Sequence, residues 1–420
     1  MIRPGAALAA ALAAALPAAC ATAEPPSRAV SSPSTTDWRQ VDADTGKITD
    51  AEGLERLAEA FPASSSVRLR LLNAQLAAKD FAGLIATLSW LEKRGYEFSQ
   101  TARTQIPRLV GDAHAEQASQ LLLKPAPPVE RSSVHATAPA EAGLVESVLV
   151  DSETGRMAAT SVSTRSLWGA GGDGNWRPYA PEGAGNLSGI VFEPGRNTIW
   201  VASGIIDGSE RPGFAGLYEV PPGTAPARRI PAPDGVTLSD LHRAAGGAIY
   251  ASDPIGGGVY VLRSGADGLE TLVPPGTFRS PQGLATSADG RLLYVSDYRY
   301  GIAVVPLDGG APALLTTDLP LILDGVDGLW RRGDELIAMQ NGTSPMRISA
   351  FRLSRDGMRV IGHRVLERAH SEWTEPLSGH LGPDALYYVG NGQWDRWIAS
   401  EPAAGKPFGP TQIRRLPLER

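Results

Sequence analysis

A short pattern recurs six times in the C-terminal part of this chain and constrains its fold more than any other feature. Each copy is a run rich in apolar residues that ends on a small polar residue, and successive end residues lie 42, 50, 44, 44 and 50 positions apart. This spacing, with room for four short strands per copy, is typical of the blades of a β-propeller. The six copies predict the second strand of each blade: residues 156–161, 198–203, 248–253, 292–297, 336–341 and 386–391.

The clearest copy of the repeat spans Arg279–Gly310. A Pro-Gln-Gly turn leads into an apolar strand, Asp289 and Gly290 signal a tight hairpin, and a second strand ends on Asp297. The chain also carries 47 glycines and 34 prolines, which suits a fold with many turns. The sequence therefore predicts a mainly β protein whose core is a six-bladed β-propeller.

The chain before the propeller has a helical pattern. Residues 50–123 contain three amphipathic stretches, Ala51–Phe61, Val67–Ala78 and Asp80–Lys93, and further helix is expected after Gln100. The second and third stretches resemble one tetratricopeptide repeat. A single repeat rarely folds alone, so the module is expected to pack on the propeller or on a partner; a purely structural helical cap is the simpler interpretation.

Domain boundaries follow from these patterns. A Pro-rich linker is expected over residues 124–142 and the propeller over 143–420. Because a propeller must close its ring, the last segment, Thr411–Leu418, is expected to be an outer strand. An end strand of this kind usually completes a blade that began at the other terminus.

The N-terminal sequence indicates a targeting segment. Residues 1–20 form a predicted signal peptide, in which the apolar run Ala6–Ala19 is too short to cross a bilayer. Cys20 is the only cysteine, so no internal disulfide is expected, and its context resembles a bacterial lipoprotein cleavage box. The interpretation is export to the periplasm with a lipid anchor in the outer membrane, followed by a flexible tether over 21–49; ordinary secretion with cleavage after Ala23 is the alternative.

The charge of the chain excludes one class of partner. Its net charge is −6 and its pI about 5.6, and the sequence shows no basic stripe. Nucleic acid is therefore not an expected partner, and contact with a membrane is expected only through the lipid.

Similar turn motifs precede the inner strand of each blade. Inner strands face the central channel, so polar residues where they start are expected to converge on one channel mouth. With the phased repeats, these motifs make residues 143–418 resemble the senescence-marker/gluconolactonase/luciferin-regenerating family. The motifs are L-V-E-S-V, L-S-G-I, L-S-D-L-H, P-Q-G-L-A, V-D-G-L-W and E-P-L-S-G-H.

The resemblance implies one divalent cation at the channel mouth. Carried over by motif, its ligands are Glu146, Ser239, Gln282 and Asp327, and Asp327 is also the general base. Ser239 and Gln282 stand where the family has asparagine, which puts the activity in doubt more than the fold. Oxygen ligands suit a hard cation, calcium above all. The simpler interpretation of Asp327 is a hydrogen bond to its own turn backbone.

Other polar residues near the blade ends are candidates for a second shell or for substrate contact. The simpler interpretation is that they satisfy backbone groups between blades or pack as ordinary histidines. The expected function is metal-dependent hydrolysis of a lactone or related ester. The alternative is a non-catalytic propeller that binds a small ligand or an envelope protein, through the channel mouth or the helical module. These further candidates are Asp240, His242, Asp297, Asn341, His380 and Asn391.

Overall fold

The structure, a computed structural model, describes residues 37–41, 43–122, 126–223 and 225–419. The predicted signal peptide, Cys20 and the first part of the tether lie outside the described residues, so export and lipid anchoring stay predictions. Among the helices described, none is long and apolar enough to cross a membrane.

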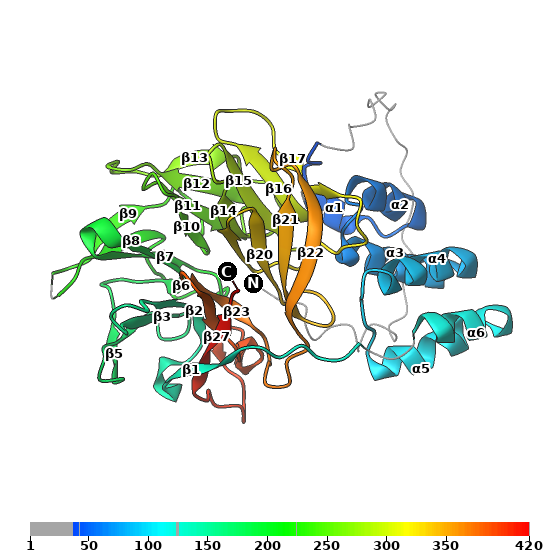
Figure 1. Cartoon of the computed structure of the whole chain (residues 1–420), viewed down its shortest axis with the longest axis horizontal. Coiled ribbons are helices and arrows are strands. Elements are labelled where there is room, and N and C mark those ends of the chain that lie inside the picture. The colour runs from blue at the N-terminus through cyan, green and yellow to red at the C-terminus, as the bar shows by residue number, and fades with distance from the viewer. Residues whose placement is uncertain (1–36, 42, 123–125, 224, 420) are drawn as a thin grey trace.

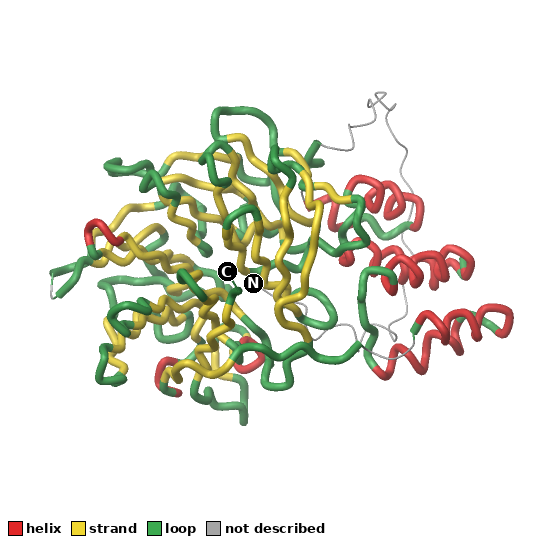
Figure 2. The backbone as a smooth tube through the Cα atoms, in the orientation of Figure 1, coloured by secondary structure: helices red, strands yellow, loops and turns green. Residues whose placement is uncertain are grey.

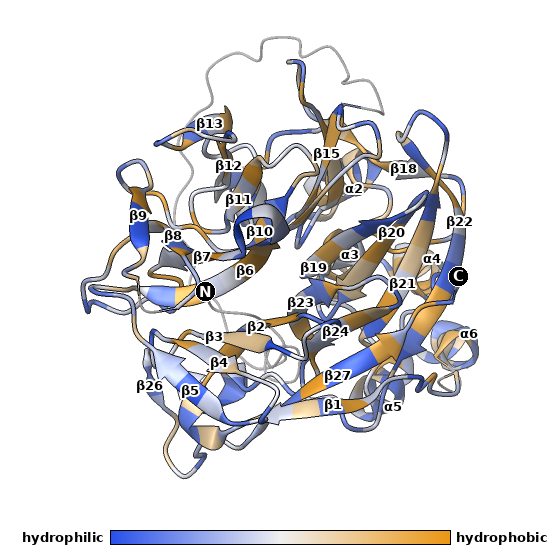
Figure 3. Cartoon of the chain, turned by 60° about the vertical axis from the view of Figure 1, so that its left-hand side comes forward, coloured by the Kyte–Doolittle hydropathy of each residue, from blue (hydrophilic) through white to orange (hydrophobic). Residues whose placement is uncertain are grey.

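Six sheets stand around a central axis, as the repeat predicts (Figure 1). Figure 3 shows the first strands of the blades, such as β2, β6, β19 and β23, nearest to this axis. Blade 1 contains β2 (Val145–Val150), β3 (Met157–Ser161), β4 (Leu167–Ala170) and β5 (Trp176–Tyr179). Blade 2 contains β6 (Asn186–Glu193), β7 (Thr198–Gly204), β8 (Gly216–Val220) and β9 (Arg228–Pro231). Blade 3 contains β10 (Leu241–Arg243), β11 (Ile249–Asp253), β12 (Gly258–Leu262) and β13 (Glu270–Val273).

The remaining blades follow the same antiparallel plan. Blade 4 contains β14 (Pro281–Thr286), β15 (Leu292–Asp297), β16 (Gly301–Pro306) and β17 (Ala313–Leu314). Blade 5 contains β19 (Gly328–Arg332), β20 (Glu335–Gln340), β21 (Arg347–Leu353) and β22 (Arg359–Arg368), with β18 (Thr316–Thr317) parallel to β22 at the outer edge. Blade 6 contains β23 (Leu377–Leu381), β24 (Ala385–Val389), β27 (Thr411–Pro417) and β1 (Ser133–Ala138), and β25 (Trp397–Ile398) pairs with β26 (Glu401–Pro402) in a separate hairpin. All six predicted second strands are confirmed, as β3, β7, β11, β15, β20 and β24.

Strands from both ends of the chain share blade 6, as expected for a closed ring, but their order differs from the expectation. Strand β27, predicted as an outer strand, is the third strand of blade 6, and β1 pairs with it as the outermost strand. The predicted linker 124–142 thus contains a propeller strand, which corrects that boundary. The backbone groups of β1 find their partners on a strand nearly 280 positions later, from Ser133↔Arg415 to Ala138↔Thr411, and no local pattern reports such a pairing.

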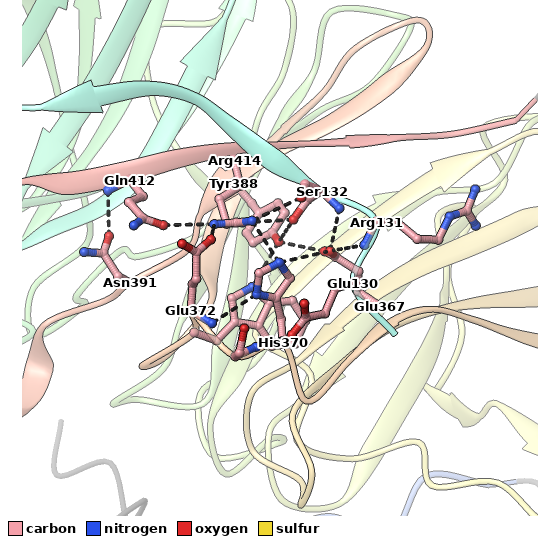
Figure 4. A network of polar contacts seen from close by, with 12 residues as sticks. Glu130, Arg131, Ser132, Glu367, His370, Glu372, Tyr388, Asn391, Gln412 and Arg414 are labelled. Carbon is pink, nitrogen blue, oxygen red and sulfur yellow. Dashed lines mark hydrogen bonds and ion pairs between the residues drawn. The ribbon is translucent and has the colours of Figure 1, made fainter. Parts of the chain in front are cut away.

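A buried polar network fixes the chain just before β1 (Figure 4). One carboxylate oxygen of Glu367, at the end of β22, accepts the backbone N–H groups of Arg131 and Ser132 at 2.9 and 2.7 Å. The other accepts the hydroxyl of Tyr388 at 2.7 Å. Glu367 and Tyr388 are both fully buried, so this network ties the start of β1 to blades 5 and 6 at once.

Arg414, on β27, completes this network and is only 2% exposed. Its guanidinium donates to the hydroxyl of Ser132 at 2.9 Å, to the carbonyl of Ser132 at 3.1 Å and to a carboxylate oxygen of Glu372 at 2.6 Å. It also lies 2.8 Å from Nε2 of His370 (Figure 4). We call Ser132, Glu367, Tyr388 and Arg414 the closure network.

Apolar side chains fill the space between neighbouring blades. Each pair of neighbours has its own buried cluster, for example Ile337, Met339 and Leu386 between blades 5 and 6. Burying one such side chain contributes about 1.5–3 kcal/mol. The blade-to-blade contacts therefore hold the inner strands, and the residues at their ends, in place.

The helices gather at one side of the propeller (Figure 2). Apolar residues of α2 and α3 join the cluster between blades 3 and 4, and Trp38 packs edge-on against Phe61 and Phe278 with ring centroids 5.2 Å apart in both pairs. The predicted docking of the helical module on the propeller agrees with these contacts. The helices are α1 (Ala43–Lys47), α2 (Ala51–Ala60), α3 (Ser65–Ala78), α4 (Phe81–Glu92), α5 (Gln100–Leu109) and α6 (Asp112–Leu121).

Asp324 of the propeller caps helix α3. Its carboxylate oxygens accept the backbone N–H groups of Ser65 and Ser66, both at 2.8 Å, where the helix dipole favours negative charge. The hydroxyl of Ser65 also donates to it at 2.9 Å. Burial raises the pKa of Asp324, and these hydrogen bonds oppose that shift.

Replacing Asp324 with alanine is expected to loosen the module without unfolding the ring. The change leaves two N–H groups at the start of α3 without acceptors, at about 1–3 kcal/mol for each buried group. Hydrogen exchange is expected to rise in α2 and α3 and to stay unchanged in blades 1 and 2. Unchanged exchange in α3 would show that the apolar contacts alone hold the module.

Candidate functional site

The four predicted metal ligands all lie where the first strand of a blade starts. Glu146 and Gln282 are the second residues of β2 and β14. Asp327 directly precedes β19, and Ser239 stands two residues before the first residue of β10. All four side chains are buried. The structure places each of them at the blade position that the motifs predict; that they share one ion stays a prediction.

Glycines explain how neighbouring inner strands come so close at this mouth. The backbone N–H of Gly189 donates to the carbonyl of Ser239 at 2.7 Å, and that of Gly283 donates to the carbonyl of Asp327 at 2.9 Å. A Cβ at either glycine would lie 2.4 Å from a backbone atom of the next blade. The Gly of L-S-G-I and P-Q-G-L is therefore needed for close approach of the strands.

Asp327 is oriented by the side chain of Asn341, which directly follows strand β20. Its Oδ2 accepts the side-chain amide of Asn341 at 3.1 Å, and the same amide donates to the carbonyl of Pro376 at 3.0 Å. The hydroxyl of Tyr298 donates to Oδ1 of Asn341 at 2.8 Å. Asn341 thus contacts Asp327 directly, while Tyr298 was not among the predicted residues; a role of Asn341 at a functional site stays a prediction.

Glu146 is held by a residue that the sequence did not single out. The indole N–H of Trp394, in the short helical turn Trp394–Arg396, donates to its Oε2 at 2.7 Å. Trp394 ends the run G-N-G-Q-W after the sixth repeat copy. Only the closed ring brings blade 6 beside blade 1, so this contact has no local signal.

The two positions that depart from the family pattern differ in their surroundings. The amide of Gln282 donates to the hydroxyl of Ser280 at 3.1 Å. Its carbonyl oxygen is the kind of atom that a hard cation accepts as a ligand. The backbone of Ser239 is engaged on both sides, because its N–H donates to Ser252 and its carbonyl accepts from Gly189. Ser239 can therefore offer only its hydroxyl.

Several of the other candidates satisfy backbone groups, as the simpler interpretation holds. Asp297 accepts the N–H groups of Arg279 and Arg299 at 2.6 and 3.1 Å, and burial raises its pKa to about 6. Asn391 accepts the N–H of Gln412 at 2.6 Å. Both residues have backbone-binding roles in this structure.

The sequence motifs place His242 and His380 in the turns at the channel mouth, but this prediction is wrong. In the structure they lie within the inner strands β10 and β23. They line a cavity of about 230 Å³ inside the channel together with Asp240. Burial lowers the pKa of His242 and of His380 to about 4 in each case. Nε2 of His242 accepts the N–H of Thr286 at 3.1 Å, so its ring proton resides on Nδ1. Both rings are uncharged at neutral pH.

The histidines give the protein a predictable sensitivity to acid. For His380 the unfolded chain takes up a proton near pH 6.5 and the folded chain only near pH 4, so stability falls as the pH falls through this window. At about pH 5 this one group costs about 2 kcal/mol of unfolding free energy. His380→Phe is expected to lose less stability between pH 7 and about pH 5 than wild type, measured by urea unfolding. Equal losses would contradict the shift; His114→Phe, on α6, is the control.

A second cavity, of about 340 Å³, opens beside blade 6. Most of the residues in its wall are polar or charged, and Asn391 is one of them. Its lining residues are Thr374, Glu375, Asn391, Gly392, Gln393, Asp395 and Arg396.

The donor set at the mouth suits a hard cation. In the described part of the chain no three His, Cys, Asp or Glu side chains come together as a metal-type cluster. The predicted ligand set contains only two carboxylates, Glu146 and Asp327, so it depends on Gln282 and Ser239 for the rest. Carboxylate, amide and hydroxyl oxygens are ligands that Ca²⁺ accepts, and the chemistry of these residues therefore fits such an ion.

Comparisons with known proteins give only distant similarities. No protein-family model matches the sequence, and no curated protein matches it. The chain is similar to a solved gluconolactonase from Xanthomonas campestris, with 15% identity over 71% of this chain and 99% of the other and a TM-score of 0.47. It is also similar to a calcium-binding regucalcin from Agrobacterium tumefaciens, with 15% identity over 67% of this chain and 95% of the other and a TM-score of 0.44. A luciferin-regenerating enzyme is similar with 15% identity over 69% of this chain and 95% of the other and a TM-score of 0.46. At this identity and with TM-scores below 0.5, no property of these proteins is carried over to this chain.

Proposed function

We propose that this chain is an exported propeller that hydrolyses a lactone or a related ester at its channel mouth with a divalent cation, calcium, as cofactor. The observation that carries the proposal is Asp327, a buried carboxylate held by Asn341 at the start of an inner strand. A carboxylate that serves as a general base must be held in one orientation. The pair of Asn341 and Tyr298 provides this orientation.

The roles of the residues follow from their contacts. Glu146, Asp327, the carbonyl of Gln282 and the hydroxyl of Ser239 would hold the cation, which when bound polarises a carbonyl and acidifies water. Asp327 accepts the proton of the attacking water. Trp394 keeps the carboxylate of Glu146 in place through its 2.7 Å hydrogen bond.

Metal content and melting temperature test the cation directly. An ion that binds only the folded state at about 100 times its dissociation constant adds about 2.7 kcal/mol of stability. Chelator is therefore expected to lower the melting temperature of the purified wild type, and calcium to restore it. Gln282→Asn, which introduces the family's residue, is expected to tighten binding. A melting curve that ignores both chelator and calcium, with no metal found on purification, would overturn the cation site.

A non-catalytic binding protein is the second candidate. It is favoured by Ser239 and Gln282, which depart from the family's asparagines, and by the amide of Gln282 being engaged with Ser280. A metal-bound protein that hydrolyses none of a panel of γ- and δ-lactones and simple esters would favour this candidate over the hydrolase.

A further inference from the structure

Two arginines of the helical module stack on one tryptophan. The guanidinium carbon of Arg94 lies 4.0 Å from the ring centroid of Trp90, and that of Arg68 lies 4.9 Å from it. Trp90 belongs to α4, Arg68 to α3, and Arg94 follows the end of α4. The indole thus holds two like charges close together.

The pair lacks an anion. Within the described residues the side chain of Arg68 makes no hydrogen bond and no ion pair, and that of Arg94 makes one hydrogen bond, to the carbonyl of Trp90 at 3.3 Å. The Nε atoms of both are buried without a partner. Glu59 attracts Arg68 but forms no ion pair with it. Buried donors are normally satisfied, and an unsatisfied group often marks a missing ion or partner.

The two charges also repel each other. Burial, with the charge of Arg68 as a second cause, lowers the pKa of Arg94 to about 10, and burial lowers the pKa of Arg68. Each group would be stabilised by an anion, and a planar guanidinium fits a carboxylate through two parallel hydrogen bonds. The face of the Trp90 ring keeps both guanidinium groups oriented when no anion is bound.

We propose that Arg68, Trp90 and Arg94 form a docking site for an acidic segment of a protein partner. The two cavities described above are lined by propeller residues only, so neither of them includes this site. The helices that carry these residues lie at one side of the ring (Figure 1). A segment with several carboxylates supplies a counter-charge to both arginines at once. This site is independent of hydrolysis at the channel mouth.

The test uses a labelled hexaglutamate peptide and the full mature protein at low ionic strength. Wild type is expected to bind, and Arg68→Gln and Arg94→Gln are each expected to weaken binding about tenfold, the equivalent of about 1.4 kcal/mol. Arg108→Gln removes the same charge from an exposed position on α5 and is expected to bind as wild type does. No binding by wild type, or an equal loss in Arg108→Gln, would overturn the proposal.

Stability supplies a second readout that a purely structural stack would not give. Arg94→Gln removes the repulsion, so without peptide it is expected to melt at or above wild type. Added peptide is expected to raise the melting temperature of wild type more than that of Arg94→Gln. A clear fall in the melting temperature of Arg94→Gln, unaffected by peptide, would show a structural stack. If inorganic phosphate binds at these arginines and hexaglutamate does not, the site takes small oxyanions and the protein partner is excluded.

Discussion

Asp327→Asn is expected to abolish hydrolysis, with kcat/KM falling by about 10²–10⁴-fold, the usual contribution of a positioned general base. An amide keeps the size of the carboxylate and can still accept the hydrogen bond from Asn341, so the fold at the mouth is retained. It cannot accept a proton from water at neutral pH. The measurement is the initial rate on γ- and δ-lactones across a pH range, with circular dichroism to confirm folding.

Asn341→Ala separates positioning from chemistry. It leaves the carboxylate of Asp327 in place and removes the group that orients it, so kcat is expected to fall while KM changes little. Asn391→Ala serves as a control, because Asn391 also ends a repeat copy but binds the backbone of Gln412. Full activity in Asp327→Asn, with folding intact, would remove this residue from the mechanism and favour the binding protein.

The sequence predicted those parts of the fold that depend on local sequence patterns. All six second strands alternate with turn residues at a regular period, and every one is found where it was expected. In two of the blades the start of the inner strand was also marked by a glycine that permits contact between blades, in L-S-G-I and P-Q-G-L. The repeat also pointed to Asn341, whose side chain contacts Asp327.

The parts that were missed depend on contacts between distant segments. Strand β1 lies in a proline-containing stretch that resembles a linker, and only pairing with β27 makes it a strand. Trp394 reaches Glu146 across 248 positions, and Asp324 meets Ser65 across 259. The histidines were misplaced by a few residues, because the length of the turn before a short strand such as β10 cannot be read from the repeat.

Arg414→Met is expected to be the most destabilising of the substitutions considered, at about 3–5 kcal/mol of unfolding free energy, because it breaks a buried charged network by removing one partner. Methionine fills part of the space, but the carbonyl and hydroxyl of Ser132 lose their donors. The buried carboxylate of Glu367, connected to Arg414 through Tyr388 and Ser132, also loses its nearby positive charge. Since β1 is the strand that closes the ring, the loss of these hydrogen bonds is expected to destabilise blades 5 and 6 together.

Arg415→Met is the matched control for this prediction. Arg415 is the next residue on β27, but its ion pair with Asp384 is largely exposed, so its loss is expected to cost at most about 1 kcal/mol. Unfolding in urea gives both values, and hydrogen exchange locates the change. With Arg414→Met, exchange is expected to rise first in β1 and β27, because a ring opens where its ends meet. If the two variants lose equal stability, the closure network is no more than a set of surface contacts, and the apolar clusters between blades hold the ring shut.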